Sequence, residues 1–163
     1  MHPIAAGASG DQLLLLGNEA IARGAIEAGV EVVASYPGTP SSEIVETLVE
    51  VSTDLGFYAE WSVNEKVSFE LAAGAALTGA RSLATMKGAG LNVVMDMFLT
   101  LPYGGTRGGL VVVVADDPGA HYSSNEQDSR FAAQWAMIPC LEPESHQEAK
   151  DMTKFAFALS ERL

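Results

Sequence analysis

Cysteine and basic residues are both scarce in this sequence. Cys140 is the one cysteine among 163 residues, and one thiol can build neither an internal disulfide nor the multi-thiolate shell of a zinc finger or an iron–sulfur cluster. Lysine and arginine number 9 against 21 acidic residues, which gives a net charge of −12. Nucleic acids and anionic membrane surfaces both attract basic proteins, so this charge argues against either as a partner.

Long apolar runs are also missing. The longest unbroken aliphatic run, Leu110–Ala115, has six residues, whereas a membrane-spanning helix needs about 20. No basic segment precedes the short run Leu13–Leu16, as it would in a secretory signal peptide. Hydrophobic residues make up 48% and charged residues 18%, a balance that excludes an intrinsically disordered chain. We therefore expect a folded cytoplasmic protein.

The length fits one domain, since domains run to roughly 100–200 residues. Residues 1–11 are small and polar and are expected to form a loose lead-in. Residues 12–163 show no internal repeat and no linker-like segment, so they are expected to form a single domain with its own core.

Apolar runs rich in β-branched residues alternate with segments of helical period. Asn18 is a plausible N-cap for the first helix, and Gly29 a plausible end. This alternation predicts an α/β fold, a three-layer sandwich with a mostly parallel central sheet. The predicted strands are 30–36, 57–61, 82–86, 110–115 and 138–141. The predicted helices are 19–28, 42–55, 64–79 and 91–101, followed by a short helix near residue 130 and a last helix from residue 145 to the end.

Ligands of such sheets bind at the carboxyl ends of the strands. The predicted loops there are 37–42, 62–65, 87–90, 116–129 and 142–145. In the first of them, Pro37-Gly38-Thr39-Pro40 offers a rigid backbone, a hydroxyl group and a following helix N-terminus, which together suit an anionic group. The same residues equally suit a stiff turn with an ordinary helix cap.

Two further loops carry candidate chemistry. Glu65 lies in the first turn of a helix, where a carboxylate stabilises the helix dipole. Apolar neighbours would make it partly buried, and a carboxylate in such a place can exchange a proton. The segment Lys87-Gly88-Ala89-Gly90 does not match the spacing of a phosphate-binding loop. It suits a site where a flat ligand lies against bare backbone.

Other unusual residues point less clearly to function. Adjacent acids at Asp116 and Asp117 fit no standard metal site, so no metal ligand is expected in this chain. Cys140, in a predicted strand, is expected to be inert core. The small-residue helix segment Leu71–Ala80 permits close approach by another backbone, either its own sheet or a second subunit. The residues alone thus predict a ligand-binding α/β domain without specifying a reaction.

Three segments, read in order, carry a family resemblance: YPGTPSSE from Tyr36, EWSVNEK from Glu60, and ADDPG followed by NEQDSR from Ala115. Together they resemble the pyrimidine-binding (PYR) domain of the thiamine-diphosphate-dependent 2-oxoacid:ferredoxin oxidoreductase family, in its indolepyruvate branch. The likeness covers roughly residues 12–152. It implies the PYR type of α/β fold.

The resemblance implies a catalytic role for Glu65, which matches the family glutamate that meets N1′ of the cofactor's aminopyrimidine. Sharing a proton there makes the 4′ nitrogen basic enough to deprotonate thiazolium C2. Thr39 matches a position beside cofactor and substrate, and His121 is a candidate substrate contact in the loop typical of this branch. The implied cofactor-binding residues are Pro37, Gly38, Thr39, Pro40, Glu65, Lys87, Gly88, Gly90 and Asn92.

The resemblance also implies parts that this sequence does not contain. Family members bind the diphosphate through Mg²⁺ on a separate domain with a G-D-G…N motif, and no G-D-G occurs here. Their iron–sulfur clusters would likewise lie outside this chain. The chain is therefore expected to be a fragment or one part of a larger homo- or hetero-oligomeric enzyme, inactive alone. The implied reaction oxidatively decarboxylates aryl 2-oxoacids to acyl-CoA, with coenzyme A and ferredoxin as partners.

Two alternatives keep the same fold. The chain could be the PYR subunit of a non-oxidative 2-oxoacid decarboxylase, similar to the alpha subunit of sulfopyruvate decarboxylase. It could also be a non-catalytic binding domain. The identity of the partner polypeptide separates the decarboxylase from the oxidoreductase. Cofactor titration, with and without Mg²⁺ and candidate partners, separates the non-catalytic domain from both.

Overall fold

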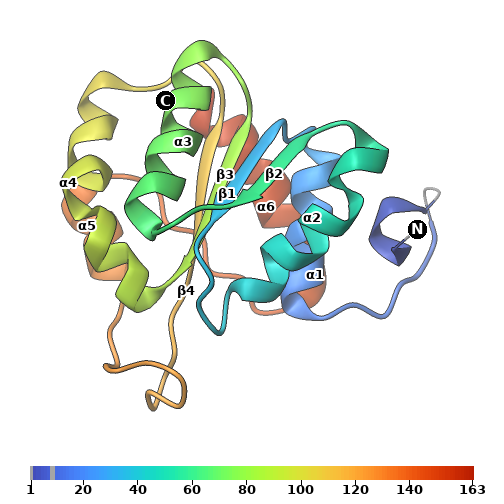
Figure 1. Cartoon of the computed structure of the whole chain (residues 1–163), viewed down its shortest axis with the longest axis horizontal. Coiled ribbons are helices and arrows are strands. Elements are labelled where there is room, and N and C mark those ends of the chain that lie inside the picture. The colour runs from blue at the N-terminus through green and yellow to red at the C-terminus, as the bar shows by residue number, and fades with distance from the viewer. Residues whose placement is uncertain (1, 8–9) are drawn as a thin grey trace.

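Four parallel strands form the centre of the protein. The computed structural model describes residues 2–7 and 10–163. Within them the strand order is β2-β1-β3-β4, and each neighbouring pair is parallel (Figure 1). The strands are β1 Val32–Ser35, β2 Tyr58–Trp61, β3 Ser82–Lys87 and β4 Leu110–Ala115.

Helices cover both faces of this sheet. α1, α2 and α6 lie on one face, and α3, α4 and α5 on the other (Figure 1). The predicted three-layer α/β sandwich is therefore confirmed. The helices are the 3-10 turn η1 Pro3–Ala5 and the α-helices α1 Gly17–Glu27, α2 Ser42–Leu55, α3 Glu65–Thr78, α4 Gly88–Gly104, α5 Arg130–Ala136 and α6 His146–Ser160. Across the described ranges, no helix combines the length and apolar character that crossing a membrane requires.

The core has two halves because strand side chains alternate between the faces of the sheet. On β4, Val111 packs into the cluster under α1, α2 and α6, whereas Val112 packs against the cluster under α3, α4 and α5. Phe69 and Phe98 join α3 to α4 in an edge-to-face contact, with ring centroids 6.3 Å apart. Part of the expected lead-in joins the first cluster, since Ile4 is fully buried.

The prediction of a fifth strand at residues 138–141 is wrong. Ile138–Leu141 forms no ladder with any described residue, and β4 is one of the two edge strands of the sheet. A strand is stabilised by pairing with a neighbour, so an apolar, β-prone segment with no adjacent edge remains coil.

Several predicted boundaries also change. The glycine-rich turn 87–90 is instead the beginning of α4, which starts at Gly88 and ends at Gly104. Asn18 lies inside α1 rather than at its N-cap, which is Leu16. Gly79 is the left-handed C-cap of α3, at φ 112°, and not an interior position. Glycine has a low helix propensity, so the sequence predicts it outside helices. Propensity is a local property, and it does not show where tertiary contacts leave no room for a Cβ atom in the first turn of a helix.

One ion pair at the far end of the sheet gives a pH-dependent prediction. Arg81 holds Glu161 through two hydrogen bonds, Nε–Oε1 at 2.6 Å and a guanidinium Nη–Oε2 contact at 2.7 Å. The hydrogen bond from Arg81 lowers the pKa of Glu161 below its ordinary value of 4.5. The stabilisation is therefore complete above the unfolded-state pKa, and it is lost as pH falls through the folded-state pKa.

Glu161→Gln should accordingly lower the free energy of unfolding by about 0.5–1 kcal/mol at neutral pH, the range of a partly exposed pair. The difference should vanish in acid. Urea unfolding at both pH values measures it, with Glu50→Gln as an exposed control on α2. A Glu161→Gln effect that is equal in acid and at neutral pH would refute the ion pair as its cause.

Candidate ligand site at the carboxyl edge of the sheet

The strand order predicts a ligand-binding crevice between β1 and β3. The chain leaves β1 through α2 to reach β2 on one side, and it leaves β3 through α4 to reach β4 on the other. Because these connections diverge onto opposite faces, the carboxyl ends of β1 and β3 form a topological switch point, where open α/β sheets bind ligands. The loops after β1 and β4 project from this same edge in Figure 1.

The turn after β1 is held in one conformation by hydrogen bonds. The Gly38 N–H donates to Ser42 Oγ at 2.9 Å, and Ser41 Oγ donates to the Gly38 carbonyl at 2.8 Å. The Thr39–Pro40 peptide bond is cis. Thr39 itself is exposed, so its hydroxyl group is presented by a rigid turn.

Asn18 is a site residue that sequence reasoning missed. Its Nδ2 donates to the Pro40 carbonyl and to Glu43 Oε2, each at 2.8 Å, and so ties α1 to the turn. Asn18 and Pro40 are 22 residues apart, and an asparagine before a helical segment also suits a cap. Nothing local in the sequence distinguishes these two uses.

Glu65 stands at the first position of α3. Asn64 caps the helix, because its Oδ1 accepts a hydrogen bond from the Val67 N–H at 2.9 Å. The Glu65 side chain lies against Gly90 at the beginning of α4: a Cβ atom at position 90 would be 2.8 Å from both Cγ and Oε1 of Glu65. The structure thus brings together two residues that are 25 positions apart in sequence and were both predicted to be in the site.

The Glu65 carboxylate is available to a ligand. It is half-buried, and it has no hydrogen-bond or ion-pair partner in residues 2–7 and 10–163. Val63 and Val67, on either side of it in sequence, are 79% and 39% exposed. A carboxylate without a described partner, next to a glycine, can accept a hydrogen bond from a flat polar ligand.

Lys87 joins the two halves of the crevice. It is the last residue of β3, and its aliphatic stem covers Gly38: a Cβ atom at position 38 would lie 3.2 Å from Lys87 Cγ. Lys87 is half-buried and forms no ion pair within the described ranges. The predicted residues Gly38, Glu65, Lys87 and Gly90 therefore converge on the carboxyl ends of β1 and β3.

The loop after β4 contacts α4 through Gln127, another residue that the sequence analysis did not select. Gln127 Nε2 donates to the Gly88 carbonyl at 2.6 Å, and Gln127 Oε1 accepts from Asn92 Nδ2 at 2.9 Å. Asp116 anchors the other end of the loop by accepting from the backbone N–H and the hydroxyl group of Ser129. Asn92, expected beside the cofactor, is thus hydrogen-bonded to this loop.

His121 is exposed in the loop, with its ring beside Gly119. No hydrogen bond or ion pair of its side chain links it to another described residue. The neighbouring Asp117 organises the turn, and the Tyr122 N–H is the main cause of its lowered pKa. Within residues 2–7 and 10–163, no cluster of His, Cys, Asp and Glu is arranged to hold a metal ion.

One prediction outside the crevice needs correction, and another is resolved. Cys140 is exposed rather than buried in the core, although partial burial of its thiol raises its pKa. In the small-residue segment of α3, Ala72, Ala73 and Ala76 are buried in the core cluster of that face. A Cβ atom at Gly74 would meet nothing within 4 Å. The alanines therefore pack against the sheet of this chain, which is one of the two partners expected for the segment.

The structure is an α/β domain with a candidate ligand site at the switch point between β1 and β3. There the Glu65 carboxylate, which has no described partner, lies against Gly90 in the first turn of α4. A family model for the thiamine-diphosphate-binding region of pyruvate flavodoxin/ferredoxin oxidoreductases matches residues 23–163. The chain belongs to this family.

Its curated relatives include longer proteins. The chain is 57% identical over 153 residues to the indolepyruvate oxidoreductase subunit IorA of Pyrococcus abyssi, covering 94% of this chain and 24% of that protein. It is 52% identical to the IorA subunit of Archaeoglobus fulgidus, covering 99% and 27%. A 2-oxoglutarate synthase subunit, KorA of Methanothermobacter thermautotrophicus, is 29% identical, covering 93% and 42%. The chain spans about a quarter of the length of the IorA subunits.

A solved structure shares the fold. The 2-oxoglutarate:ferredoxin oxidoreductase from Magnetococcus marinus, with 2-oxoglutarate, coenzyme A and succinyl-CoA bound, superimposes with a TM-score of 0.76 at 22% identity. The match covers 91% of this chain and 27% of that chain. The expected α/β fold of a thiamine-dependent oxidoreductase domain is thereby confirmed.

Proposed function

We propose that this chain is the aminopyrimidine-binding part of a thiamine-diphosphate-dependent 2-oxoacid oxidoreductase, and that Glu65 is its catalytic residue. The observation that carries this proposal is the half-buried Glu65 carboxylate, which lies against Gly90 and has no partner within the described ranges. A carboxylate so placed can hold a proton shared with a ring nitrogen of the cofactor.

The crevice residues fit an aminopyrimidine. Gly88 and Gly90 are buried at the start of α4. Gly88 lies under Asp116 and Gln127, and Gly90 leaves the Glu65 side chain the room that a Cβ atom would take. The turn of Pro37, Gly38, Thr39 and Pro40 forms the opposite side, bridged by the stem of Lys87. Thiamine diphosphate, when bound, supplies the electron sink for decarboxylation of a 2-oxoacid. Asn92 acts on this site through Gln127: the Asn92 amide donates a hydrogen bond to Gln127, and the Gln127 amide donates one to the Gly88 carbonyl.

The diphosphate half of the cofactor would be bound elsewhere. A diphosphate is usually held through Mg²⁺, a cation that prefers carboxylate and carbonyl oxygens together with the phosphates. The described residues contain no acidic cluster of that kind. A second domain or subunit would therefore supply the Mg²⁺ site, which makes the working enzyme an oligomer or a multidomain assembly. Iron–sulfur clusters would belong to other parts of that assembly.

The substrate that we propose is an aryl 2-oxoacid of the indolepyruvate type, oxidised to an acyl-CoA with ferredoxin as electron acceptor. The names of the relatives with over 50% identity support the indolepyruvate assignment. The coenzyme A and ferredoxin named for the structural neighbour suggest the co-substrates. Thr39 on its rigid turn and His121 in the exposed loop are the residues of this chain that we propose as substrate contacts. The cytoplasmic location stays a prediction.

A comparison of thiamine with thiamine diphosphate tests whether this chain binds the aminopyrimidine while another domain binds the diphosphate. Since the charged half has no site here, the isolated chain should bind the two compounds with affinities that differ by less than about tenfold. With the complementing domain and Mg²⁺ present, the diphosphate should bind far more tightly. Equilibrium titration measures both. Micromolar, diphosphate-selective binding by the isolated chain would contradict the proposal, and so would a complemented assembly that binds neither compound.

A further inference from the structure

Lys87, the last residue of β3, carries an ammonium group without a partner. The side chain is half-buried, and its Nζ forms no hydrogen bond or ion pair with any residue in the ranges 2–7 and 10–163. Charged groups that are partly removed from water are usually paired. Acidic residues outnumber basic ones by 21 to 9, so the chain has carboxylates to spare for such a pair. The unpaired ammonium therefore points to an anionic ligand.

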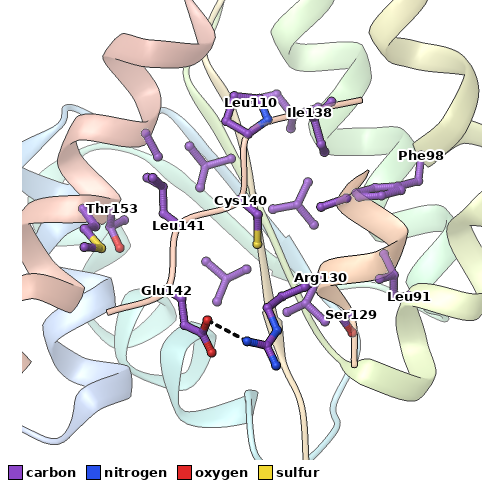
Figure 2. A pocket seen from close by; sticks show the side chains of 18 of the residues that line it. Leu91, Phe98, Leu110, Ser129, Arg130, Ile138, Cys140, Leu141, Glu142 and Thr153 are labelled. Atoms are coloured by element: carbon purple, nitrogen blue, oxygen red, sulfur yellow. Dashed lines mark hydrogen bonds and ion pairs between the residues drawn. The ribbon is translucent and has the colours of Figure 1, made fainter. Parts of the chain in front are cut away.

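Two other cations at the carboxyl edge of the sheet are already neutralised. Lys66 Nζ donates to Asp96 Oδ2 at 2.7 Å. Arg130 lies in the groove between β4 and residues 138–143, where its guanidinium is 3.3 Å from a carboxylate oxygen of Glu142 (Figure 2). Among the described residues, Lys87 is thus the one lysine or arginine at this edge that an anion could use without breaking an existing ion pair.

The stem of Lys87 is packed against the turn after β1. A Cβ atom at position 38 would lie 3.2 Å from Lys87 Cγ, 3.3 Å from Cδ and 3.7 Å from Cβ. The first three carbons of the side chain therefore contact this turn, and the ammonium extends beyond them beside the turn that presents Thr39. A side chain that is already held along its stem loses less conformational entropy when its end binds a ligand.

Lys87 and Glu65 lie on opposite sides of the end of β3. Glu65 is on the side of α3 and α4, where it contacts Gly90, and Met86 belongs to the core cluster of that face. Successive side chains of a strand point to opposite faces, so Lys87 points to the face of α1 and α2, where it meets Gly38. A ligand bound over the switch point would therefore have a carboxylate on one side and an ammonium on the other.

We propose that the Lys87 ammonium binds the carboxylate of the 2-oxoacid substrate. The inference rests on the proposed function, which supplies an anionic substrate at this edge. An ammonium offers three hydrogen-bond donors and a full charge, and such charge-assisted hydrogen bonds to carboxylates are strong. A single lysine suits a carboxylate better than a diphosphate, which is usually held through Mg²⁺. Thr39, already proposed as a substrate contact, belongs to the turn that holds the Lys87 stem.

Lys87→Met tests this assignment because methionine keeps an unbranched stem over Gly38 and removes only the charge. The probes are indolepropionate, an unreactive substrate analogue that keeps the carboxylate, and its neutral amide, indolepropionamide. In the complete enzyme, assembled with its other domains or subunits, the substitution should weaken indolepropionate binding by about 10–100-fold. Binding of the amide should change by less than about twofold. Calorimetric titration measures both, and KM for the 2-oxoacid should rise with little change in kcat.

Two variants separate a direct contact from a general effect of charge. Lys66→Met removes a cation at the same edge that is already paired with Asp96, so it should bind both probes as the wild type does. Lys87→Arg keeps the charge and should retain the preference for the carboxylate over the amide. Equal weakening of indolepropionate by Lys66→Met and Lys87→Met would overturn the proposal. So would a Lys87→Met enzyme that loses affinity for thiamine diphosphate but not for thiamine.

The wild-type enzyme supplies a measurement that does not depend on a variant. Indolepropionate should slow acylation of the Lys87 amine, read by peptide-resolved mass spectrometry, while indolepropionamide should not, and Lys66 should react equally in both. A Lys87 amine that is unreactive without any ligand would assign it to an ion pair with another part of the enzyme and overturn the proposal. Hydrogen–deuterium exchange at C2 of the bound cofactor tests the proposed function separately. Normal exchange with equal losses for both probes in Lys87→Met would overturn the Lys87 assignment alone.

Discussion

Glu65→Gln should leave the protein folded while it nearly abolishes deprotonation of the bound cofactor at C2. Glutamine has the shape of glutamate, but it cannot share a proton with a ring nitrogen. Loss of a positioned general acid or base typically costs about 10²–10⁴-fold in rate. Hydrogen–deuterium exchange at C2 in the assembled enzyme measures this step directly, and steady-state turnover should fall in parallel.

The structure also explains why Glu65→Gln should not unfold the protein. The Glu65 carboxylate has no partner in residues 2–7 and 10–163, so the substitution removes no hydrogen bond or ion pair of the described chain. Glu70→Gln is the matched control, because Glu70 is exposed on the same helix and its carboxylate forms an ion pair only with the Lys66 ammonium among described groups, at 3.9 Å. If Glu65→Gln left C2 exchange at the wild-type rate, the assignment of Glu65 as the catalytic residue would fail.

Gly90→Ala is the second substitution with a large expected effect. A methyl group at position 90 would lie 2.8 Å from Glu65 Cγ and Oε1 and 3.1 Å from Met86 Cβ, so the Glu65 side chain would have to move. Misplacement of a reacting group by about 1 Å can cost on the order of 10²-fold in rate. We expect C2 exchange to fall by about that factor, with weaker binding of the cofactor ring.

Folding should change much less than activity in Gly90→Ala. Alanine is favoured over glycine in a helix by about 1 kcal/mol, which offsets part of the crowding. Gly104→Ala is the control: it lies at the other end of α4, where an added Cβ would meet nothing within 4 Å. It should leave C2 exchange unchanged. A Gly90→Ala enzyme with wild-type exchange would show that the contact between Glu65 and Gly90 does not position the carboxylate.

Much of the fold could be predicted from local patterns because burial imposes them. The continuous apolar run of β4 reflects a strand covered on both faces, and Asn64 before Glu65 is the cap that starts α3. The sequence predicts a turn at Gly88 and Gly90 because glycine is a poor helix former. In the folded protein, Asp116 and Gln127 crowd one of them and Glu65 crowds the other, so bare backbone is favoured there even inside a helix.

By itself the sequence determined the order of the first four strands and of the helices between them, the parallel sheet covered on both faces, and the edge of that sheet to which the unusual residues belong. Only the tertiary structure decided that the Glu65 carboxylate lies against Gly90, that Asn18 holds the turn after β1, and that Ile138–Leu141 stays unpaired across a groove from β4. The difference between these two sets of features has a physical cause. Periodicity and capping depend on neighbours within a few residues, whereas these contacts join segments that meet only when the sheet assembles.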